Sequence, residues 1–406
     1  MEENLDKRQY DNLRTFGFDI GAVRPSEILF CFAILSVFIP IKIYPVVFLV
    51  SALAFYFDTA KLDFPKWSIF LTVFGLFALI SFIAVYDTET SRLTNIIKLL
   101  VNFVFLYFAV TWISRRDNQR LIKSLDLILH LIFILVFLQL LYYHQALDFR
   151  LIGGSTSSGQ ASMLYNKDLY IWGVDDKNMF GARIAMIGFP YILIPLVQKN
   201  RVAILRIIFI FGLGYLSMSR TPIVALIIGC GYLLWISSHN WMRIAMIVFV
   251  VAAFPFVLQK IIRIDQLTSS NDGMGTRLVY WKAFFQNLRE IPIWGIGFEK
   301  APEFMQQYSE FYRGEPHIHN TFLNSYLELG IVGLLSFASF LFYFVQACFK
   351  KMANTHFWIM VFLPLIAIMM ILYSGYDNDI ILYLALVYLL GTSGSVNFKE
   401  TKLSLI

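Results

Sequence analysis

Apolar runs of about 15 to 25 residues recur along nearly the whole chain, from residue 27 to residue 392. A helix needs roughly 20 apolar residues to cross the hydrocarbon core of a bilayer. Backbone inside lipid must also satisfy its own hydrogen bonds, and a helix does so within one segment. The repeated runs therefore predict an all-α polytopic membrane protein with no separate soluble domain.

Composition agrees with this fold class. The chain is 58% hydrophobic and 15% charged, whereas soluble domains average about 45–50% apolar and about 25% charged residues. The three cysteines, Cys31, Cys230 and Cys348, all lie inside apolar runs and are expected to pack there. No Cys-x-x-Cys or Cys/His metal spacing occurs, so we expect neither a metal nor a cofactor.

The runs predict about twelve transmembrane helices in one membrane domain, residues 27–392. Residues 1–26 and 393–406 are expected to be cytoplasmic tails. The first run lacks a following cleavage site of small residues and is expected to remain as an uncleaved span. The first two runs are short and could also form one broken span. The expected spans are 27–40, 43–57, 68–86, 93–113, 122–143, 179–197, 202–217, 221–236, 241–259, 321–347, 357–373 and 379–392.

Lysine and arginine accumulate on the cytoplasmic side of membrane proteins. With the N-terminus inside, the inner segments hold eighteen such residues and the short outer loops hold three. The net charge of +6 is thus explained by orientation in the bilayer, and no nucleic-acid partner is expected. The inner residues are Lys7, Arg8, Arg14, Arg24, Lys61, Lys66, Arg115, Arg116, Arg120, Lys123, Lys199, Arg201, Arg206, Arg243, Lys350, Lys351, Lys399 and Lys402, and the outer ones are Lys42, Arg92 and Arg220.

Two long loops, about 144–178 and 260–320, fall on the outer side in this topology. Loops of this length in a compact protein are usually functional, so we expect the chemistry to face away from the cytoplasm. The first loop contains a flexible polar tract, Gly153–Gly159, without the glycine spacing of a nucleotide-binding loop.

The second outer loop contains a predicted amphipathic helix that lies at the membrane interface. We expect Thr276 to cap this helix, which would place Arg277 in its first turn beside the positive helix end. The apolar face is predicted to consist of Leu278, Trp281, Phe284, Phe285 and Leu288.

Three arginines on the outer side are candidate ligands for an anion. Arg183 lies about one turn into the sixth span, where it could face an outer cavity or extend its head to the interface. Arg220 opposes the charge bias of the outer loops, which favours a counter-anion, with interfacial anchoring as the alternative. Arg277 could bind pyrophosphate through its planar fork or be a solvated surface charge.

The stretch from Arg313 to Gly333 carries two histidines into an apolar run. His317 and His319 lie just before the run, and polar residues continue into it at Asn320, Asn324 and Glu328. Positions four apart share a helix face, so these three form a polar stripe. Ionisable residues inside a membrane are costly and usually functional. Glu328 could neutralise Arg183 or orient a substrate sugar, and His317 could be an ordinary loop residue.

The chain resembles the bacterial O-antigen ligase and O-antigen polymerase family. The resemblance rests on the order of three motifs over about residues 179–345, on the number of spans and on the large late outer loop. The motifs are Ser219-Arg220-Thr221 opening a span, Gly275-Thr276-Arg277-Leu278 with Trp281 in the outer loop, and His319-Asn320 followed by Glu328-Leu329-Gly330 and Gly333.

The resemblance implies a metal-independent, inverting glycosyltransferase in the bacterial inner membrane. Such an enzyme takes a glycan from undecaprenyl pyrophosphate at the periplasmic face and joins it to an acceptor glycolipid. The acceptor is another lipid-linked repeat unit for a polymerase, which we favour, or lipid A–core for a ligase. Arg220 and Arg277 would contact the pyrophosphate, and His319 would act as general base. A flippase and a chain-length regulator are the implied protein partners.

A secondary transporter is the main alternative from another class, because twelve spans with both ends inside is a common transporter plan. A flippase-like lipid carrier and a purely structural membrane protein are weaker alternatives. The two halves of the sequence show no internal repeat, and no long cytoplasmic loop follows the sixth span. The outer-side cations also argue against a site at mid-membrane, where transporters bind their substrates.

Overall fold

The protein is described by a computed structural model. Most of the predicted N-terminal tail, the tract Gly153–Gly159 and the first part of the second outer loop lie outside the described residues. The described residues are 24–39, 42–59, 62–87, 93–146, 148–149, 177–256, 273–351, 354–372, 376–394 and 396–405.

Each of the twelve predicted spans coincides with a helix. Five of these helices, α4, α5, α6, α8 and α14, are long and apolar enough to cross a membrane, counted over the described residues. The other seven are shorter apolar helices, so the number of complete crossings stays a prediction. The helices are α2 (Pro25–Ser36), α3 (Tyr44–Asp58), α4 (Lys66–Ala84), α5 (Leu93–Ile113), α6 (Gln119–Ala146), α8 (Lys177–Lys199), α9 (Ile204–Leu216), α10 (Thr221–Ser237), α11 (Asn240–Phe256), α14 (Thr321–Lys351), α15 (Thr355–Met369) and α16 (Asn378–Ser393).

The first two runs form separate helices, α2 and α3, which pack against each other. Each begins with a proline in its first turn, where the missing N–H has no intrahelical partner to lose. Whether these two short helices cross the membrane separately or together as one broken span stays a prediction.

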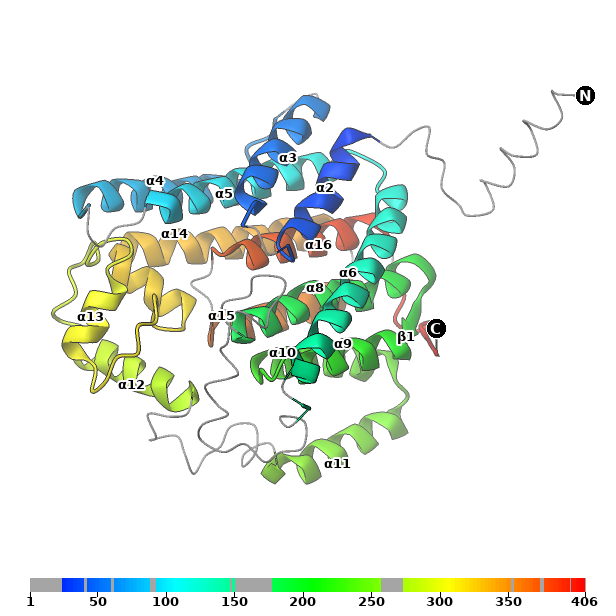
Figure 1. The fold of residues 1–406 in the computed structure, drawn as a ribbon. Helices are drawn as coiled ribbons and strands as arrows, with labels where there is room; N and C mark the ends of the chain where they lie inside the picture. The colour runs from blue at the N-terminus through cyan, green and yellow to red at the C-terminus, as the bar shows by residue number, and fades with distance from the viewer. Residues whose placement is uncertain are drawn as a thin grey trace, which may run out of the picture.

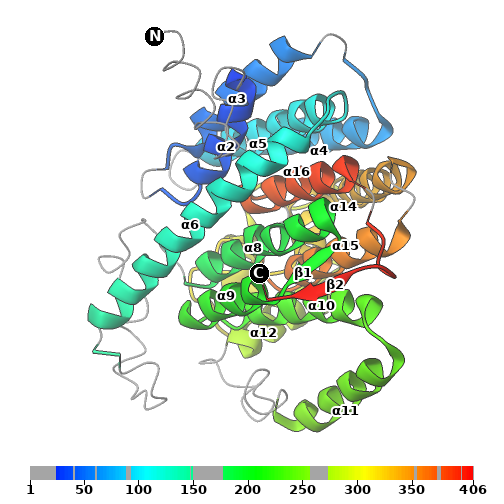
Figure 2. The same cartoon turned by 90° about the vertical axis from the view of Figure 1, so that its right-hand side faces the viewer.

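The helices stack in layers (Figures 1 and 2). In both views α14 and α16 lie between α4 and α5 on one side and α8 and α15 on the other. Close packing joins α4 to α14, α5 to α16 and α8 to α16. The helices α9 and α10 form the next layer, and α11 lies apart at the edge. The three cysteines are buried in this bundle, as expected.

Two elements of the second outer loop lie at one end of the bundle. They are α12 (Gly273–Gln286) and α13 (Ala301–Tyr308), at the left of Figure 1. The beginning of α2 and strand β2 (Lys402–Ser404) lie at the opposite end. The predicted topology requires this separation, and the compartment that each end faces stays a prediction.

The last residues of the chain pack against the α8–α9 corner. Strand β2 pairs in parallel with β1 (Arg201–Ala203), with Val202 opposite Leu403. The backbone N–H of Leu205 also donates to the Leu405 carbonyl at 3.1 Å. The segment predicted as a tail is therefore attached to the bundle along its described residues.

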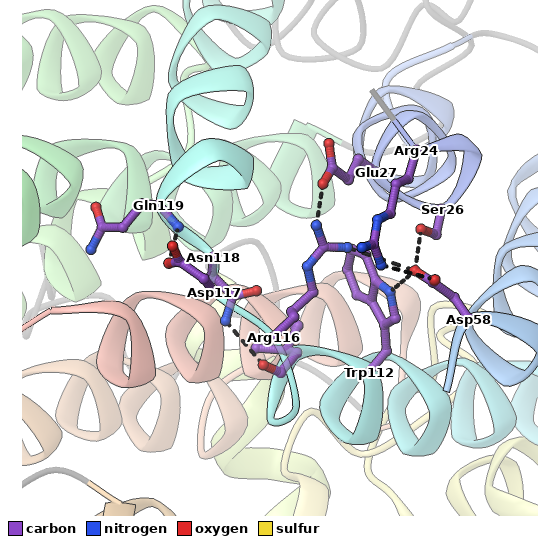
Figure 3. A network of polar contacts seen from close by, with 10 residues as sticks. Arg24, Ser26, Glu27, Asp58, Trp112, Arg116, Asp117, Asn118 and Gln119 are labelled. Atoms are coloured by element: carbon purple, nitrogen blue, oxygen red, sulfur yellow. Dashed lines mark hydrogen bonds and ion pairs between the residues drawn. The ribbon is translucent and has the colours of Figure 1, made fainter. Parts of the chain in front are cut away.

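A buried charged network joins the ends of α2, α3 and α5 (Figure 3). Arg116 forms an ion pair with Glu27 and lies 4.4 Å above the Trp112 ring. Asp58 accepts hydrogen bonds from Trp112 Nε1 at 2.7 Å and from Ser26 Oγ at 2.8 Å. This network holds the end of the bundle that is opposite to α12 and α13.

The helix α14 is broken at Gly330, whose φ of 59° and ψ of −152° suit glycine almost alone. The segment 291–299 crosses the break. The N–H groups of Ile296 and Gly297 donate to the carbonyls of Leu327 and Glu328 at 2.9 and 3.0 Å. Ile331 N–H donates to Ile293 at 2.8 Å. The backbone groups released by the break are thus satisfied inside the protein, as a membrane environment requires.

The predicted amphipathic helix is present as α12, but it starts earlier than predicted. It begins at Gly273, so Thr276 lies within the first turn and does not precede the helix as a cap. The buried side chains include Tyr280, Ala283 and Phe284, whereas Phe285 is 61% exposed. The helix packs on the loop around α13, and this contact decides which face is covered.

Candidate functional site

One backbone carbonyl orients both histidines of the loop before α14. His317 Nε2 lies 2.7 Å from the carbonyl oxygen of Leu372, and His319 Nδ1 lies 3.4 Å from the same oxygen. The two ring centroids are 4.9 Å apart, with planes at 73°. Leu372 follows α15, so the site is formed by segments that are more than 50 residues apart in sequence.

The protonation pattern of these rings follows from that carbonyl. A carbonyl oxygen can only accept a hydrogen bond, so the ring nitrogen that faces it carries the hydrogen. In His319 that nitrogen is Nδ1. Nε2 of His319 therefore keeps its lone pair and is the atom that could accept a proton.

Ile318, the residue between the two histidines, forms hydrogen bonds through both its backbone carbonyl and its backbone N–H. Trp281 Nε1 of α12 donates to the Ile318 carbonyl at 3.0 Å, and Ile318 N–H donates to Asn324 Oδ1 of α14 at 3.4 Å. The Ile318 side chain is fully buried in the small apolar cluster under α12. These contacts fix the register of the histidine loop.

Tyr280 contacts the first part of the histidine loop, at Arg313 and Glu315. Tyr280 Oη donates to Glu315, accepts the backbone N–H of Arg313 at 3.2 Å, and its ring lies parallel to His319 at 6.5 Å. Burial first, and then the hydrogen bond to Glu315, raise the pKa of Tyr280 well above its usual value. Tyr280 therefore stays a neutral donor.

Positive charge and burial keep His319 neutral. Burial lowers its pKa well below the ordinary imidazole value, and the charges of His317 and Arg277 lower it further, against the raising effect of the Leu372 hydrogen bond. The direction of the shift keeps the imidazole in the unprotonated form that a general base needs at neutral pH.

The structure brings Arg277 to the histidines and places Arg220 at a helix start. Arg277, in α12, is close enough to His319 to affect its pKa. Arg220 immediately precedes α10 and follows a tight turn. In that turn Met218 has a φ of 56°, and Ser219 Oγ donates to Asn178 Oδ1 of α8 at 3.2 Å. Whether both arginines bind one anion stays a prediction.

Asn320 has a structural role in the described protein. Its Oδ1 accepts the N–H groups of Phe322 and Leu323, each at 3.0 Å. Its Nδ2 donates to the Met370 carbonyl at 3.3 Å. These are the contacts of a helix cap, and they start α14 directly after His319.

Glu328 is buried at the break in α14, and its carboxylate is well supplied with donors. Tyr376 Oη donates to Glu328 Oε2 at 3.1 Å. Asn324 and the backbone of Glu299 also hydrogen-bond to this carboxyl group. Arg183 is engaged elsewhere, so the proposed neutralisation of Arg183 by Glu328 is wrong.

Arg183 makes a buried ion pair with the start of α16. Its Nε lies 2.9 Å from Asp379 Oδ1, and the Asp379 side chain is fully buried. Arg183 also donates to the carbonyl of Val37 at the end of α2. It therefore joins α2, α8 and α16, and its predicted role in anion binding is not needed to explain its position.

Several site residues carry no clear signal in the sequence. The Leu372 carbonyl belongs to the backbone, so residue identity cannot reveal it. Tyr376 is one of 21 tyrosines, and only its place beside the acidic Asp377-Asn378-Asp379 turn sets it apart. Among the described residues, no group of three or more His, Cys, Asp or Glu side chains is arranged to hold a metal ion.

The fold and the site define a multi-pass membrane protein whose histidine pair and nearby arginine lie at one end of a helix bundle. The family model described as O-antigen ligase matches residues 205–338, which include Arg220, Arg277, both histidines and Glu328. This match confirms the resemblance to the O-antigen ligase and O-antigen polymerase family. The comparison with curated proteins finds no match.

Proposed function

We propose that the protein is a glycosyltransferase that moves a glycan from undecaprenyl pyrophosphate to the sugar of another lipid-linked repeat unit. The site would face the periplasm from the bacterial inner membrane. The observation that carries this proposal is His319, kept neutral beside Arg277 and held by Leu372, within the segment that matches the family.

His319 Nε2 takes the proton from the acceptor hydroxyl while the hydroxyl oxygen attacks the anomeric carbon of the donor. The bond between that carbon and the pyrophosphate oxygen breaks, and the electron pair leaves on the pyrophosphate. Fixed guanidinium groups stabilise the charge that builds there, and Arg277 and Arg220 are the proposed ones. Attack opposite the leaving group inverts the anomeric centre.

The reaction uses no metal in this proposal. Transfer by the purified protein is expected to continue in the presence of a chelator. Strong inhibition that is reversed by a divalent ion would contradict this part of the proposal.

A ligase is the second candidate, because the matching family model is described as O-antigen ligase. The lipopolysaccharide of a deletion strain separates the two. Loss of a polymerase leaves cores that carry a single repeat unit, whereas loss of a ligase leaves bare cores and glycan stranded on the lipid carrier. The His319→Ala variant should fail to restore the wild-type pattern in either case.

An unchanged lipopolysaccharide ladder in the deletion strain would contradict both roles in lipopolysaccharide synthesis. Polymerisation of a capsule or an exopolysaccharide would then be tested by the same transfer assay. A flippase and a chain-length regulator are the proposed partners, and crosslinking in cells would detect them. A secondary transporter would instead move a substrate in vesicles and would make no glycosidic bond.

A further inference from the structure

The polar stripe of α14 ends at Glu328, for which the transfer chemistry above has no role. Glu328 is 3% exposed and lies two residues before the break at Gly330. Its carboxylate is surrounded by protein donors from three segments: Tyr376, Asn324 and the backbone of Glu299. A side chain enclosed in this way is better suited to holding protein segments than to binding a sugar.

One of these donors, Asn324, bonds directly to the histidine loop. Asn324 also accepts the N–H of Ile318, the residue between His317 and His319. Its Nδ2 lies 3.5 Å from the Tyr376 hydroxyl. Glu328, Tyr376 and Asn324 therefore form one hydrogen-bonded group with the backbone of that loop.

Tyr376 also contacts the helices α4 and α5. Tyr376 lies four residues after Leu372, whose carbonyl orients both imidazoles. The Tyr376 carbonyl accepts Asn102 Nδ2 of α5 at 3.0 Å, and its ring contacts Phe74 at 5.6 Å. Tyr376 is thus held by α4 and α5, and its hydroxyl group donates to Glu328.

We propose that Glu328 is a positioning residue for the histidine pair: together with Tyr376 it holds Asn324, which fixes the Ile318 backbone between the two imidazoles and so sets the direction of His319 Nε2. This inference rests on the proposed function for its kinetic consequence. Its structural consequence, a loosened histidine loop, does not depend on any substrate.

The test uses the full-length protein in detergent or vesicles and the variants Tyr376→Phe, Glu328→Gln and Glu328→Ala. Tyr376→Phe removes one hydroxyl and keeps the ring that packs on Phe74, so folding should survive. Ser336→Ala is the matched control, because Ser336 is a buried polar residue of α14 whose hydroxyl bonds only within its own helix.

The first measurement is the rate at which diethyl pyrocarbonate modifies His317 and His319, read by peptide mass. We expect a several-fold increase in Tyr376→Phe and a larger one in Glu328→Ala, with Glu328→Gln between wild type and Glu328→Ala. Ser336→Ala should match wild type. Unchanged modification rates in Tyr376→Phe and Glu328→Ala would overturn the proposal, even if wild-type protein transferred no glycan.

The second measurement is transfer kinetics. Positioning predicts a lower kcat with an unchanged KM for the acceptor, and a double variant Glu328→Ala/Tyr376→Phe that is no worse than Glu328→Ala alone. A raised KM in Glu328→Ala together with normal kinetics in Tyr376→Phe would show that Glu328 binds the sugar directly and would overturn the proposal. Absence of transfer by the wild-type protein would contradict the proposed function. The modification rates of His317 and His319 would still test the positioning role of Glu328.

Discussion

The indole of Trp281 donates its Nε1–H to the backbone carbonyl of Ile318 at 3.0 Å. This bond joins α12 to the residue that separates the two histidines. It gives Trp281, which is part of the family motif, a physical role that requires an N–H donor as well as an aromatic ring.

Replacing Trp281 by phenylalanine keeps an aromatic ring and removes that donor. A buried hydrogen bond contributes about 1 kcal/mol net, so we expect transfer to fall roughly fivefold if the whole effect acts on the position of His319. Trp241→Phe, on the exposed face of α11, is the control and should behave as wild type. Full activity of Trp281→Phe in the transfer assay would show that the ring alone suffices.

Removing the guanidinium of Arg277 should nearly abolish transfer. Loss of one group that stabilises developing charge costs about 10²–10³ in kcat in comparable sites. Arg277→Lys should recover little, because an ammonium lacks the planar fork for a pyrophosphate. The exposed Arg289, on the same loop, provides the control variant Arg289→Ala. Equal losses in the two alanine variants would point to a general effect of surface charge.

The pH dependence should reflect the lowered pKa of His319. The neutral imidazole persists below about pH 6.5, so the acid limb of kcat should lie below the ordinary histidine value. The unfolded chain binds the proton more readily than the folded one in this window. His319 therefore makes the protein less stable as pH falls from about 6.5 toward its lowered pKa, and this effect levels off below it.

Removing the neighbouring positive charge should reverse part of that shift. His317→Gln and Arg277→Gln should each raise the pKa of His319 toward its usual value, as followed by NMR titration of labelled histidine. His356→Gln is the control, since His356 bonds Tyr232 at a distance from this loop. A His319 signal that titrates identically in all variants would contradict the electrostatic explanation.

Gly330 is expected to tolerate no side chain. A Cβ there would lie 2.0 Å from the Ile293 carbonyl oxygen, and the backbone is in a region reserved almost entirely for glycine. Gly330→Ala should lose about 2 kcal/mol or more of stability, measured by thermal unfolding in detergent. Gly231→Ala in α10 meets open space and should be neutral or slightly stabilising. A normal melting temperature for Gly330→Ala would mean that α14 is continuous.

The ion pair between Arg183 and Asp379 should be needed for stability and not for chemistry. Removing either residue takes the ion-pair partner away from a buried charge, at a cost of about 3 kcal/mol or more. The double variant Arg183→Leu/Asp379→Leu should be more stable than either single leucine variant and should keep measurable transfer. If the double variant folds and transfers nothing, Arg183 does bind the substrate, as its position in the sequence first indicated.

The sequence predicted α14 and the neighbouring histidines, but it could not predict the break at Gly330. The polar stripe from Asn320 to Glu328 obeys helical spacing, and an apolar run long enough for a helix continues past the break. Three hydrogen bonds between the segment 291–299 and α14 stabilise the interruption. A pattern of polar and apolar side chains cannot show that the backbone of segment 291–299 crosses α14 at Gly330.

The sequence by itself determined where the apolar helices lie and which chemical groups the outer end carries, because hydrophobic length and residue type are local properties. Only the tertiary structure decided which of those groups meet. Arg183 pairs with Asp379 from 196 residues away, and His319 is oriented by a leucine carbonyl. Partners of this kind are set by the packing of helices. Because every residue has a backbone carbonyl oxygen, the residue type does not reveal which carbonyl orients His319.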